Sequence, residues 1–208
     1  MYLADIGNRY AHLYDGKTVR HLSIDNLIKS YSNKKVCYIN VNPNNIAKLS
    51  AISNWIDLSR YVNLDGSYEG MGIDRQTLLL SRGDGIYIDA GSAITIDKKL
   101  NSKFIGGTIL PGIWRVKECY GDISSVLKID NLARIDIDKL PTDSTKMSIS
   151  YGIIAPIVSL IKSINSENLP IYCCGGDGKL ISSYIDKSEY IEDLIFEGMK
   201  KVIKESRC

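Results

Sequence analysis

This 208-residue sequence lacks several features that would assign its class at once. It has no block of lysine and arginine: 26 basic residues are dispersed among 24 acidic ones, and the net charge of +2 argues against nucleic acid as the main partner. The pattern Gly-x-x-x-x-Gly-Lys-[Ser/Thr] does not occur, which excludes a P-loop. The longest apolar run, residues 153–161, is far too short to span a bilayer, so we expect no membrane segment.

The cysteine pattern does not indicate a metal site. The five cysteines are odd in number and lack the spacing of a zinc site. The adjacent pair Cys173-Cys174 lies in a β-rich run and is most simply a pair of reduced, buried, small apolar residues. This usage favours a reducing cytoplasm. The chain starts with a strand pattern that carries Asp5, so we expect no signal peptide.

What the sequence does contain is one short pattern that occurs twice. Asp5-Ile6-Gly7-Asn8 follows the apolar start of the chain, and Asp89-Ala90-Gly91-Ser92 follows the apolar run 86–88. Each copy places a carboxylate at the end of a β-like run, followed by a glycine and a small polar residue. After each turn the chain returns with alternating polarity. The sequence therefore predicts two strand–turn–strand units of the same design.

Such a turn can hold both a phosphate and a cation. Glycine lets backbone N–H groups approach an anion closely because no Cβ blocks the approach, and the adjacent carboxylate can hold a cation that bridges the phosphates. A single copy is more simply an ordinary hairpin turn, since Asp and Gly are the commonest turn residues. The pairing favours a nucleotide site in which Asp5 orients Mg²⁺ and Asn8 and Ser92 contact ATP phosphates. This indicates phosphoryl transfer.

The second part of the chain repeats the order of elements of the first. Asp15-Gly16 marks a hairpin turn in the first part. Strands are predicted at 12–14, 18–22, 36–41, 103–106 and 170–174, with a hairpin over 86–97. Helices are predicted at 23–30, from Pro111-Gly112 onward, near 145–164 and over 191–205. We expect two similar α/β halves, residues 1–82 and 83–208, with a cleft between them.

A further candidate for chemistry is Gly72-Ile73-Asp74-Arg75. A carboxylate near a transferable phosphate could accept the proton of a substrate hydroxyl. The guanidinium beside it suits a substrate carboxylate or phosphate, which it can grip with two hydrogen bonds. An adjacent Asp and Arg are more often a surface ion pair of little energetic worth, so this interpretation stays open on the residues alone.

Two glycine-rich segments and two histidines complete the candidates. Residues 106–112 read as a strand end and a helix entry with Pro111 near the first helical position. Residues 175–178 form either a tight turn or a ligand site, because α/β proteins bind ligands at the carboxyl ends of core strands. His12 and His21 stand isolated in the sequence, and we interpret both as structural.

Taken together, these segments resemble the type III pantothenate kinases, bacterial members of the acetate and sugar kinase/Hsp70/actin superfamily. The resemblance covers nearly the whole chain. Its first phosphate motif falls on 5–8, its second on 89–95, its substrate motif on 72–75, and its two further glycine signatures on 106–112 and 175–176. No single piece is specific, whereas the combination in this order is. The resemblance implies two RNase H-like, actin-like ATPase halves with an interdomain cleft.

The resemblance also assigns roles. It implies an ATP-dependent pantothenate kinase with Asp74 as proton acceptor, Asp89 as ligand of a monovalent cation (K⁺ or NH₄⁺) and Mg²⁺ as a second cofactor. It further implies a cytoplasmic homodimer whose partner subunit helps to close the pantothenate pocket. The implied ATP contacts are Asp5, Ile6, Gly7, Asn8, Arg9, Tyr10, Ala11, His12 and Ser92. The implied substrate contacts are Gly72, Ile73, Asp74, Arg75 and Thr145, the last lying seven residues before Gly152.

The chain departs from the family pattern in three places. Arg9 and Ser92 stand where the family commonly has threonine, and Asp65 stands where it often has a substrate-contacting tyrosine, the nearest aromatic being Tyr68. Two other functions compete. An RNase H-like nuclease could use four aspartates to hold two metals, namely Asp5, Asp74, Asp89 and Asp97. The other is a non-catalytic, actin-like ATP-binding or assembly protein. The glycine-rich phosphate turns disfavour the first, and the short chain and the Asp74-Arg75 motif disfavour the second.

Overall fold

The computed structural model describes residues 1–206 and divides the chain into two compact units. Of the described residues, unit 1 comprises 1–83, 99–105 and 192–206, and unit 2 comprises 84–98 and 106–191. The sequence-based division into residues 1–82 and 83–208 stays a prediction. The C-terminal helix α7 (Leu194–Ser206) belongs with unit 1 because its apolar residues Phe196, Met199 and Val202 are part of the core of that unit.

Unit 1 is built on a five-stranded sheet in the order β3-β2-β1-β4-β5. Its strands are β1 (Tyr2–Ile6), β2 (Ala11–Tyr14), β3 (Val19–Leu22), β4 (Val36–Asn40) and β5 (Trp55–Asp57). The first three are antiparallel neighbours, whereas β1–β4 and β4–β5 are parallel. The central strand β1 thus ends next to β4, and its last residues 5 and 6 pair with residues 39 and 40. This edge of the sheet carries the first copy of the repeated pattern.

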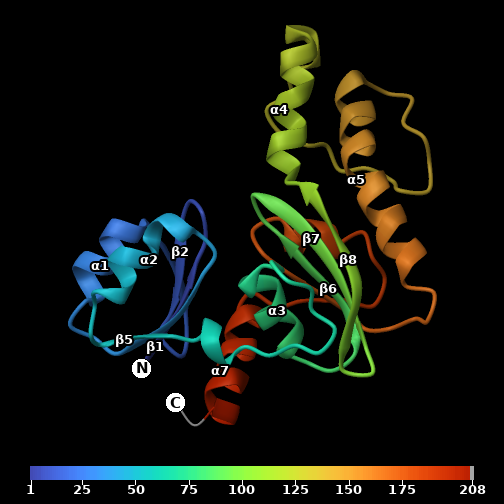
Figure 1. Cartoon of the computed structure of the whole chain (residues 1–208). Helices are drawn as coiled ribbons and strands as arrows, with labels where there is room; N and C mark the ends of the chain where they lie inside the picture. Colours follow the sequence, from blue (N-terminus) through green and yellow to red (C-terminus); the bar gives the residue numbers. More distant parts are fainter. Residues whose placement is uncertain (207–208) are drawn as a thin grey trace. The chain divides into compact units, whose positions relative to one another are not determined.

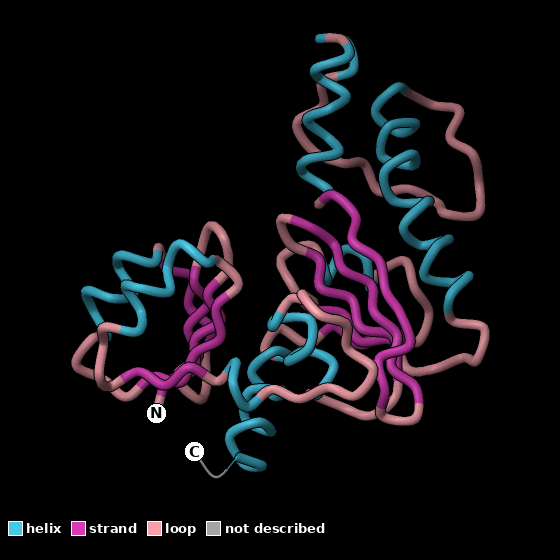
Figure 2. The backbone as a smooth tube through the Cα atoms, viewed as in Figure 1, coloured by secondary structure: helices cyan, strands magenta, loops and turns pink. Residues whose placement is uncertain are grey.

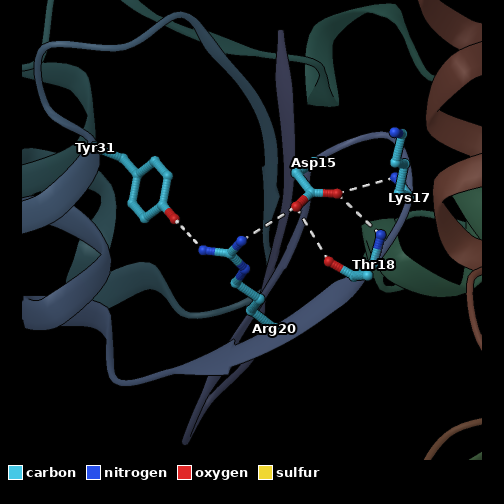
Figure 3. Close-up of polar contacts among 5 residues, drawn as sticks. All are labelled: Asp15, Lys17, Thr18, Arg20 and Tyr31. Atoms are coloured by element: carbon cyan, nitrogen blue, oxygen red, sulfur yellow. Dashed lines mark hydrogen bonds and ion pairs between the residues drawn. The ribbon is translucent and has the colours of Figure 1, made fainter.

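The predicted hairpin turn between β2 and β3 is confirmed. Figure 3 shows the Asp15 carboxylate accepting hydrogen bonds from the backbone N–H groups of Lys17 and Thr18, each at 2.9 Å, while Arg20 reaches the same carboxylate. These backbone hydrogen bonds lower the pKa of Asp15, that of Thr18 most. Gly16 takes a positive φ of 103°, which an L-residue with a side chain adopts at a cost. Local turn chemistry therefore fixes the register of this hairpin.

Helices cover both faces of the unit 1 sheet. On one face, α1 (Ile24–Tyr31) and α2 (Ile46–Ser50) bury Leu27 and Leu49 against the strands (Figure 1). On the other face, Leu3 of β1 packs with Phe196 and Met199 of α7, and α7 lies against α3 (Ile73–Leu80). Side chains alternate along a strand, so Asp5, two residues after Leu3, belongs to this second face. The short 3-10 turns of unit 1 are η1 (Pro43–Asn45) and η2 (Ser59–Tyr61).

Unit 2 repeats the strand order of unit 1. Its sheet runs β10-β9-β6-β7-β8; when it is read from β8 to β10, this is the unit 1 order with β6 in the place of β1. The strands are β6 (Gly85–Ala90), β7 (Ala93–Leu100), β8 (Lys103–Pro111), β9 (Ile171–Cys174) and β10 (Ser188–Tyr190). Strand β6 pairs in parallel with β9, as β1 does with β4. The expectation of two similar α/β halves is thereby confirmed, each with its own central strand.

The helices of unit 2, drawn in cyan in Figure 2, include the 20-residue helix α5. They are α4 (Ile113–Ile123), the 3-10 turn η3 (Ser125–Leu127), α5 (Thr145–Ile164) and α6 (Gly178–Ser182). The sequence predicts Pro111 near the first helical position of α4. In the structure Pro111 ends β8, Gly112 is the N-cap, and the helix begins at Ile113. The prediction of a helix near 145–164 is confirmed.

Helix α5 is the one helix within residues 1–206 that is long and apolar enough to cross a membrane by length and composition. The helix extends beyond the apolar run 153–161 at both ends, where apolar and polar residues are mixed. Its buried residues, among them Ile149, Ile153 and Ile157, form the centre of the unit 2 core with Ile86 of β6. This burial is typical of a core helix, and a core helix can have the same length and apolar composition as a membrane-spanning one. Next to this core, burial raises the pKa of the Cys173 thiol to about 12, so this cysteine stays protonated and inert.

Candidate active site

The first copy of the repeated pattern forms the turn at the end of β1. The N–H of Gly7 donates to the Tyr10 carbonyl at 3.0 Å, which closes a four-residue loop before β2 begins. Asp5 is half-buried at the end of the strand, whereas Asn8, Arg9 and Tyr10 are exposed in the loop. The Ile6 carbonyl accepts from the N–H of Val41, just beyond the neighbouring strand β4, at 3.0 Å. The carboxylate and the glycine turn thus lie at one edge of the sheet.

The second copy forms the equivalent turn at the end of β6. The N–H of Gly91 donates to the Ala93 carbonyl at 2.9 Å, and Ser92 is exposed at the tip. The Ala90 carbonyl accepts from the N–H of Asp177, just beyond β9, at 2.9 Å. This hydrogen bond is the counterpart of that between Ile6 and Val41. The two copies therefore share this backbone hydrogen bond as well as a sequence pattern, although the second turn is shorter than the first.

The two glycine-rich segments of unit 2 converge on this second turn. A Cβ on Gly112 would lie 2.4 Å from the Gly91 carbonyl oxygen, and one on Gly175 would lie 2.5 Å from the Asp89 carboxylate oxygen Oδ1. Gly175 also has a positive φ of 83°. Each glycine is needed because a side chain would collide with the turn or with the carboxylate. Asp89 therefore packs against bare backbone, and a side chain at position 175 would displace its carboxylate.

We expect Gly175→Ala to destabilise the protein. The left-handed backbone alone costs about 1–2 kcal/mol, and the collision with Asp89 adds to it. This corresponds to a fall in melting temperature of roughly 2–8 °C for a chain of this size. Gly176→Ala is the matched control, since nothing lies within 4 Å of a Cβ at that position. Equal melting temperatures for the two variants in thermal unfolding would contradict this account.

Asp74 lies in the first turn of α3. Its Oδ1 accepts from the N–H of Arg75 at 2.8 Å, and a Cβ on Gly72 would lie 2.5 Å from the same oxygen. Because Gly72 has no Cβ, the Asp74 carboxylate can lie against the N-terminal end of α3. Burial raises the pKa of Asp74 above its ordinary value of 3.8, although the nearby backbone N–H groups and the Arg75 guanidinium oppose the shift. The carboxylate is therefore a stronger base than an exposed aspartate.

Arg75 is not a surface ion-pair partner, because it is only 6% exposed. Its Nη1 donates to the Tyr68 hydroxyl at 2.8 Å, and its guanidinium carbon lies 5.9 Å from the centre of the Phe104 ring. Tyr68 in turn packs against Phe104, with 6.0 Å between ring centres. The loop before α3 is tied to β8, since the N–H of Phe104 donates to the Asp65 carbonyl at 2.8 Å.

This cluster includes the two residues at which the chain departs from the family's tyrosine, Asp65 and Tyr68. Asp65 pairs with Lys103 at 2.9 Å, whereas Tyr68 reaches Arg75 and stands beside the substrate motif. Nothing in the sequence indicates that Phe104 belongs to this cluster, because it lies far from Arg75 along the chain, in a strand with an ordinary alternating pattern. Only the folding of the loop onto β8 shows that it supports Arg75.

Thr145 begins α5 in unit 2 and is exposed. Ser144 caps this helix, its Oγ accepting from the N–H of Met147 at 3.2 Å. Of the predicted site residues, 5–12 and 72–75 belong to unit 1, whereas Asp89, Ser92 and Thr145 belong to unit 2. Within unit 2, Asp89 and Ser92 lie at the same turn, and Thr145 lies on a separate helix.

The two histidines stand isolated in the sequence, but they are neighbours in the structure. His12 and His21 are cross-strand partners on β2 and β3, with their rings edge to face and 4.7 Å between centres. Asp5 is the partner of His12 on the other side. Burial, and next the positive charge that His21 would carry, lower the pKa of His12 below 6.5. His12 therefore faces the neighbourhood of Asp5 as a neutral imidazole at pH 7.

Distantly related solved structures share this fold. A protein from Sinorhizobium meliloti, described provisionally as a 2-dehydro-3-deoxygalactonokinase, superposes with a TM-score of 0.55 at 9% identity, over 99% of this chain and 98% of the other. This likeness shows the fold alone.

Sequence comparison is more specific. The sequence model of the type III pantothenate kinases matches residues 59–167. The type III pantothenate kinase of Campylobacter jejuni is 41% identical over 206 residues, which cover 99% of this chain and 98% of the relative. A crystal structure from Campylobacter jejuni, described provisionally as a Baf family transcriptional activator, superposes with a TM-score of 0.90 at 40% identity over 100% of this chain and 99% of the other. The chain belongs to the type III pantothenate kinase family.

Proposed function

We propose that this protein is an ATP-dependent kinase that phosphorylates the primary hydroxyl of pantothenate to give 4′-phosphopantothenate, the first step of coenzyme A biosynthesis. The observation that carries the proposal is the pair Asp74-Arg75. In a chain of this kinase family, it combines a carboxylate whose pKa is raised by burial with a buried guanidinium at one helix end. A base and an anion clamp side by side fit a substrate that has both a hydroxyl and a carboxylate.

In the proposed reaction, Asp74 accepts the proton of the pantothenate hydroxyl as its oxygen attacks the γ-phosphorus of ATP. The bond between this phosphorus and the β,γ-bridging oxygen breaks, and ADP leaves. Arg75, aligned by its hydrogen bond to Tyr68, binds the substrate carboxylate. Gly72 and Ile73 contribute backbone beside it.

The nucleotide is proposed to contact the segment 5–12 and Ser92. The exposed turn at Asn8 and Arg9 and the exposed Ser92 offer backbone N–H groups and polar side chains to phosphates. Asp5 would hold Mg²⁺ or its waters, which neutralise charge on the phosphates. Arg9 adds a positive charge to the same turn.

Asp89 is proposed to hold a monovalent cation, K⁺ or NH₄⁺. The residues fit such an ion, because the absence of a Cβ on Gly175 leaves space at Asp89 Oδ1. When bound, the cation supplies positive charge beside the phosphates.

We expect Asp89→Ala to lower ATP use and to abolish the response to K⁺. The measurement is the rate against K⁺ concentration for both proteins at constant ionic strength. The variant should give a flat response, because the site has lost its carboxylate. A K⁺ response of normal shape in an active variant would rule out this ligand.

The proposed function is tested by ADP release with pantothenate against a panel of sugars and acetate. Only pantothenate should support turnover, and phosphate should appear on its hydroxyl. Turnover with a sugar and none with pantothenate would overturn the substrate assignment.

The other functions have less support. A two-metal nuclease needs clustered carboxylates, yet within residues 1–206 no three His, Cys, Asp or Glu side chains gather closely enough to hold a metal ion. Transcriptional activation, the role in the provisional description of the Campylobacter jejuni structure, has no support from the charge pattern, because this chain has no block of basic residues for nucleic acid. Thermal-shift measurements separate these functions, since pantothenate with ATP should stabilise the protein and nucleic acid should not.

The protein is further proposed to act in the cytoplasm as a homodimer, in which a second copy helps to close the pantothenate pocket. The exposed apolar side chains near α4 support a contact with another chain. These are Trp114, Ile123 and Val126. Thr145, exposed at the start of α5, is the residue that we propose to act on the partner's substrate.

Mixing subunits tests this sharing of the site. In a heterodimer of Asp74→Asn and Thr145→Val subunits, a shared site would give one pocket with both lesions and one with neither. Activity at low pantothenate should therefore exceed the sum of the two homodimers. If heterodimers form and the activities merely average, Thr145 serves its own subunit.

A further inference from the structure

Lys99, near the end of β7, is buried in unit 1 with only 4% of its surface exposed. Burying an ammonium group is costly unless polar groups replace its water. Lys99 Nζ donates hydrogen bonds to the backbone carbonyls of Leu79 and Arg82. A charged group bound to two carbonyls of one short segment is a specific arrangement, and no sequence pattern predicts it.

The Leu79 carbonyl lies in the last turn of α3, and the Arg82 carbonyl lies just beyond the C-terminal end of this helix. The last carbonyls of a helix have no partner within it and form the negative end of its dipole, so a cation is favourable there. Helix α3 has eight residues, and its C-terminal end is therefore only about 12 Å from the turn that carries Asp74. Movement at one end of so short a helix reaches the other directly.

Helix α3 and a residue just beyond its end also make two contacts with α7. A Cβ on Gly198 would lie 2.0 Å from the Thr77 carbonyl oxygen, so the two helices are in close contact. Arg82, just beyond α3, binds Glu197 through two hydrogen bonds, of 2.9 and 3.1 Å. These contacts limit the sideways position of α3, and Lys99 holds its end.

We propose that Lys99 is a positioning residue for phosphoryl transfer: by binding the C-terminal carbonyls of α3, it fixes the turn that presents Asp74 and Arg75 to the substrate. The proposal rests on the proposed function. Displacement of a reacting group by about 1 Å can cost about 100-fold in rate, so a modest shift of α3 should be visible in kcat.

The neighbouring lysine provides a matched control. Lys98 points to the opposite face of β7, and its Nζ donates to the Ile164 carbonyl at the end of α5 at 3.2 Å and pairs with Glu167 at 2.5 Å. The same side chain on the same strand thus binds the end of a different helix. Since α5 has 20 residues, that end is about 30 Å from its first turn, and α5 does not carry Asp74.

The experiment compares Lys99→Met with Lys98→Met by kinetics. We expect Lys99→Met to lower kcat by at least about tenfold while KM for ATP stays within about twofold, and Lys98→Met to keep kcat within about twofold. A kcat for Lys99→Met within about twofold of wild type, or equal losses in the two variants, would overturn the proposal.

Hydrogen exchange of the amides over 73–80 is the second readout, and it does not depend on turnover. Exchange should be faster in Lys99→Met and unchanged in Lys98→Met; unchanged exchange in both would overturn the proposal. If wild type fails to phosphorylate pantothenate, the proposed function fails, and exchange still reports whether Lys99 holds α3. Should Lys99→Met not fold, Lys99→Gln, which lacks the charge, is judged by the same two readouts.

Discussion

Asp74→Asn is expected to reduce turnover by roughly 10²–10⁴-fold, the usual contribution of a general base. The amide preserves the shape of the carboxylate at the start of α3 but cannot accept the hydroxyl proton. ATP binding should persist, because the nucleotide is proposed to contact other segments. The measurements are kcat with pantothenate and the thermal shift produced by ATP.

Glu69→Gln is the matched control for this variant. Glu69 is an exposed carboxylate in the loop before α3, and its conversion to an amide makes the same chemical change five positions away. It should leave kcat unchanged. A rate for Asp74→Asn above about a third of wild type would show that Asp74 is not the base.

The raised pKa of Asp74 also predicts the acid side of the pH profile. Burial disfavours the carboxylate, so protonation, and with it loss of the base, begins at a higher pH than for an exposed aspartate of pKa 3.8. The rate constant kcat/KM for pantothenate should fall as the pH drops through this raised pKa. The residual activity of Asp74→Asn should lack that limb.

Arg75→Ala is expected to raise KM for pantothenate by about 10–100-fold, because it removes charge-assisted hydrogen bonds worth about 1.5–3 kcal/mol. KM for ATP should change by no more than about twofold, as Arg75 is proposed to serve the substrate alone. Steady-state kinetics with each substrate varied in turn separate the two effects.

Two further variants refine this test. Arg75→Lys should not restore the affinity, since an ammonium lacks the planar fork that binds a carboxylate. Tyr68→Phe removes the hydroxyl that accepts from Arg75 Nη1 at 2.8 Å and should have a smaller effect of the same kind. Equal increases in KM for pantothenate and ATP in Arg75→Ala would contradict a substrate-specific role.

The sequence alone determined the features that depend on local chemistry. The repeated turn at residues 5–8 and 89–92 could be predicted because Asp and Gly after an apolar run are typical turn residues and the same pattern occurs twice. The hairpin at Asp15-Gly16 and the long helix α5 follow from turn chemistry and from apolar periodicity in the same way. Together these motifs identified the family and the two similar halves.

The tertiary structure decided what depends on residues far apart in the chain. No periodicity could show that α7 completes unit 1, that Phe104 and Tyr68 enclose Arg75, or that Lys99 binds the end of α3. His12 and His21 become neighbours only through the pairing of β2 with β3. The physical reason is that local patterns select local backbone conformation, whereas burial and charge pairing depend on which surfaces meet when the sheets and helices pack.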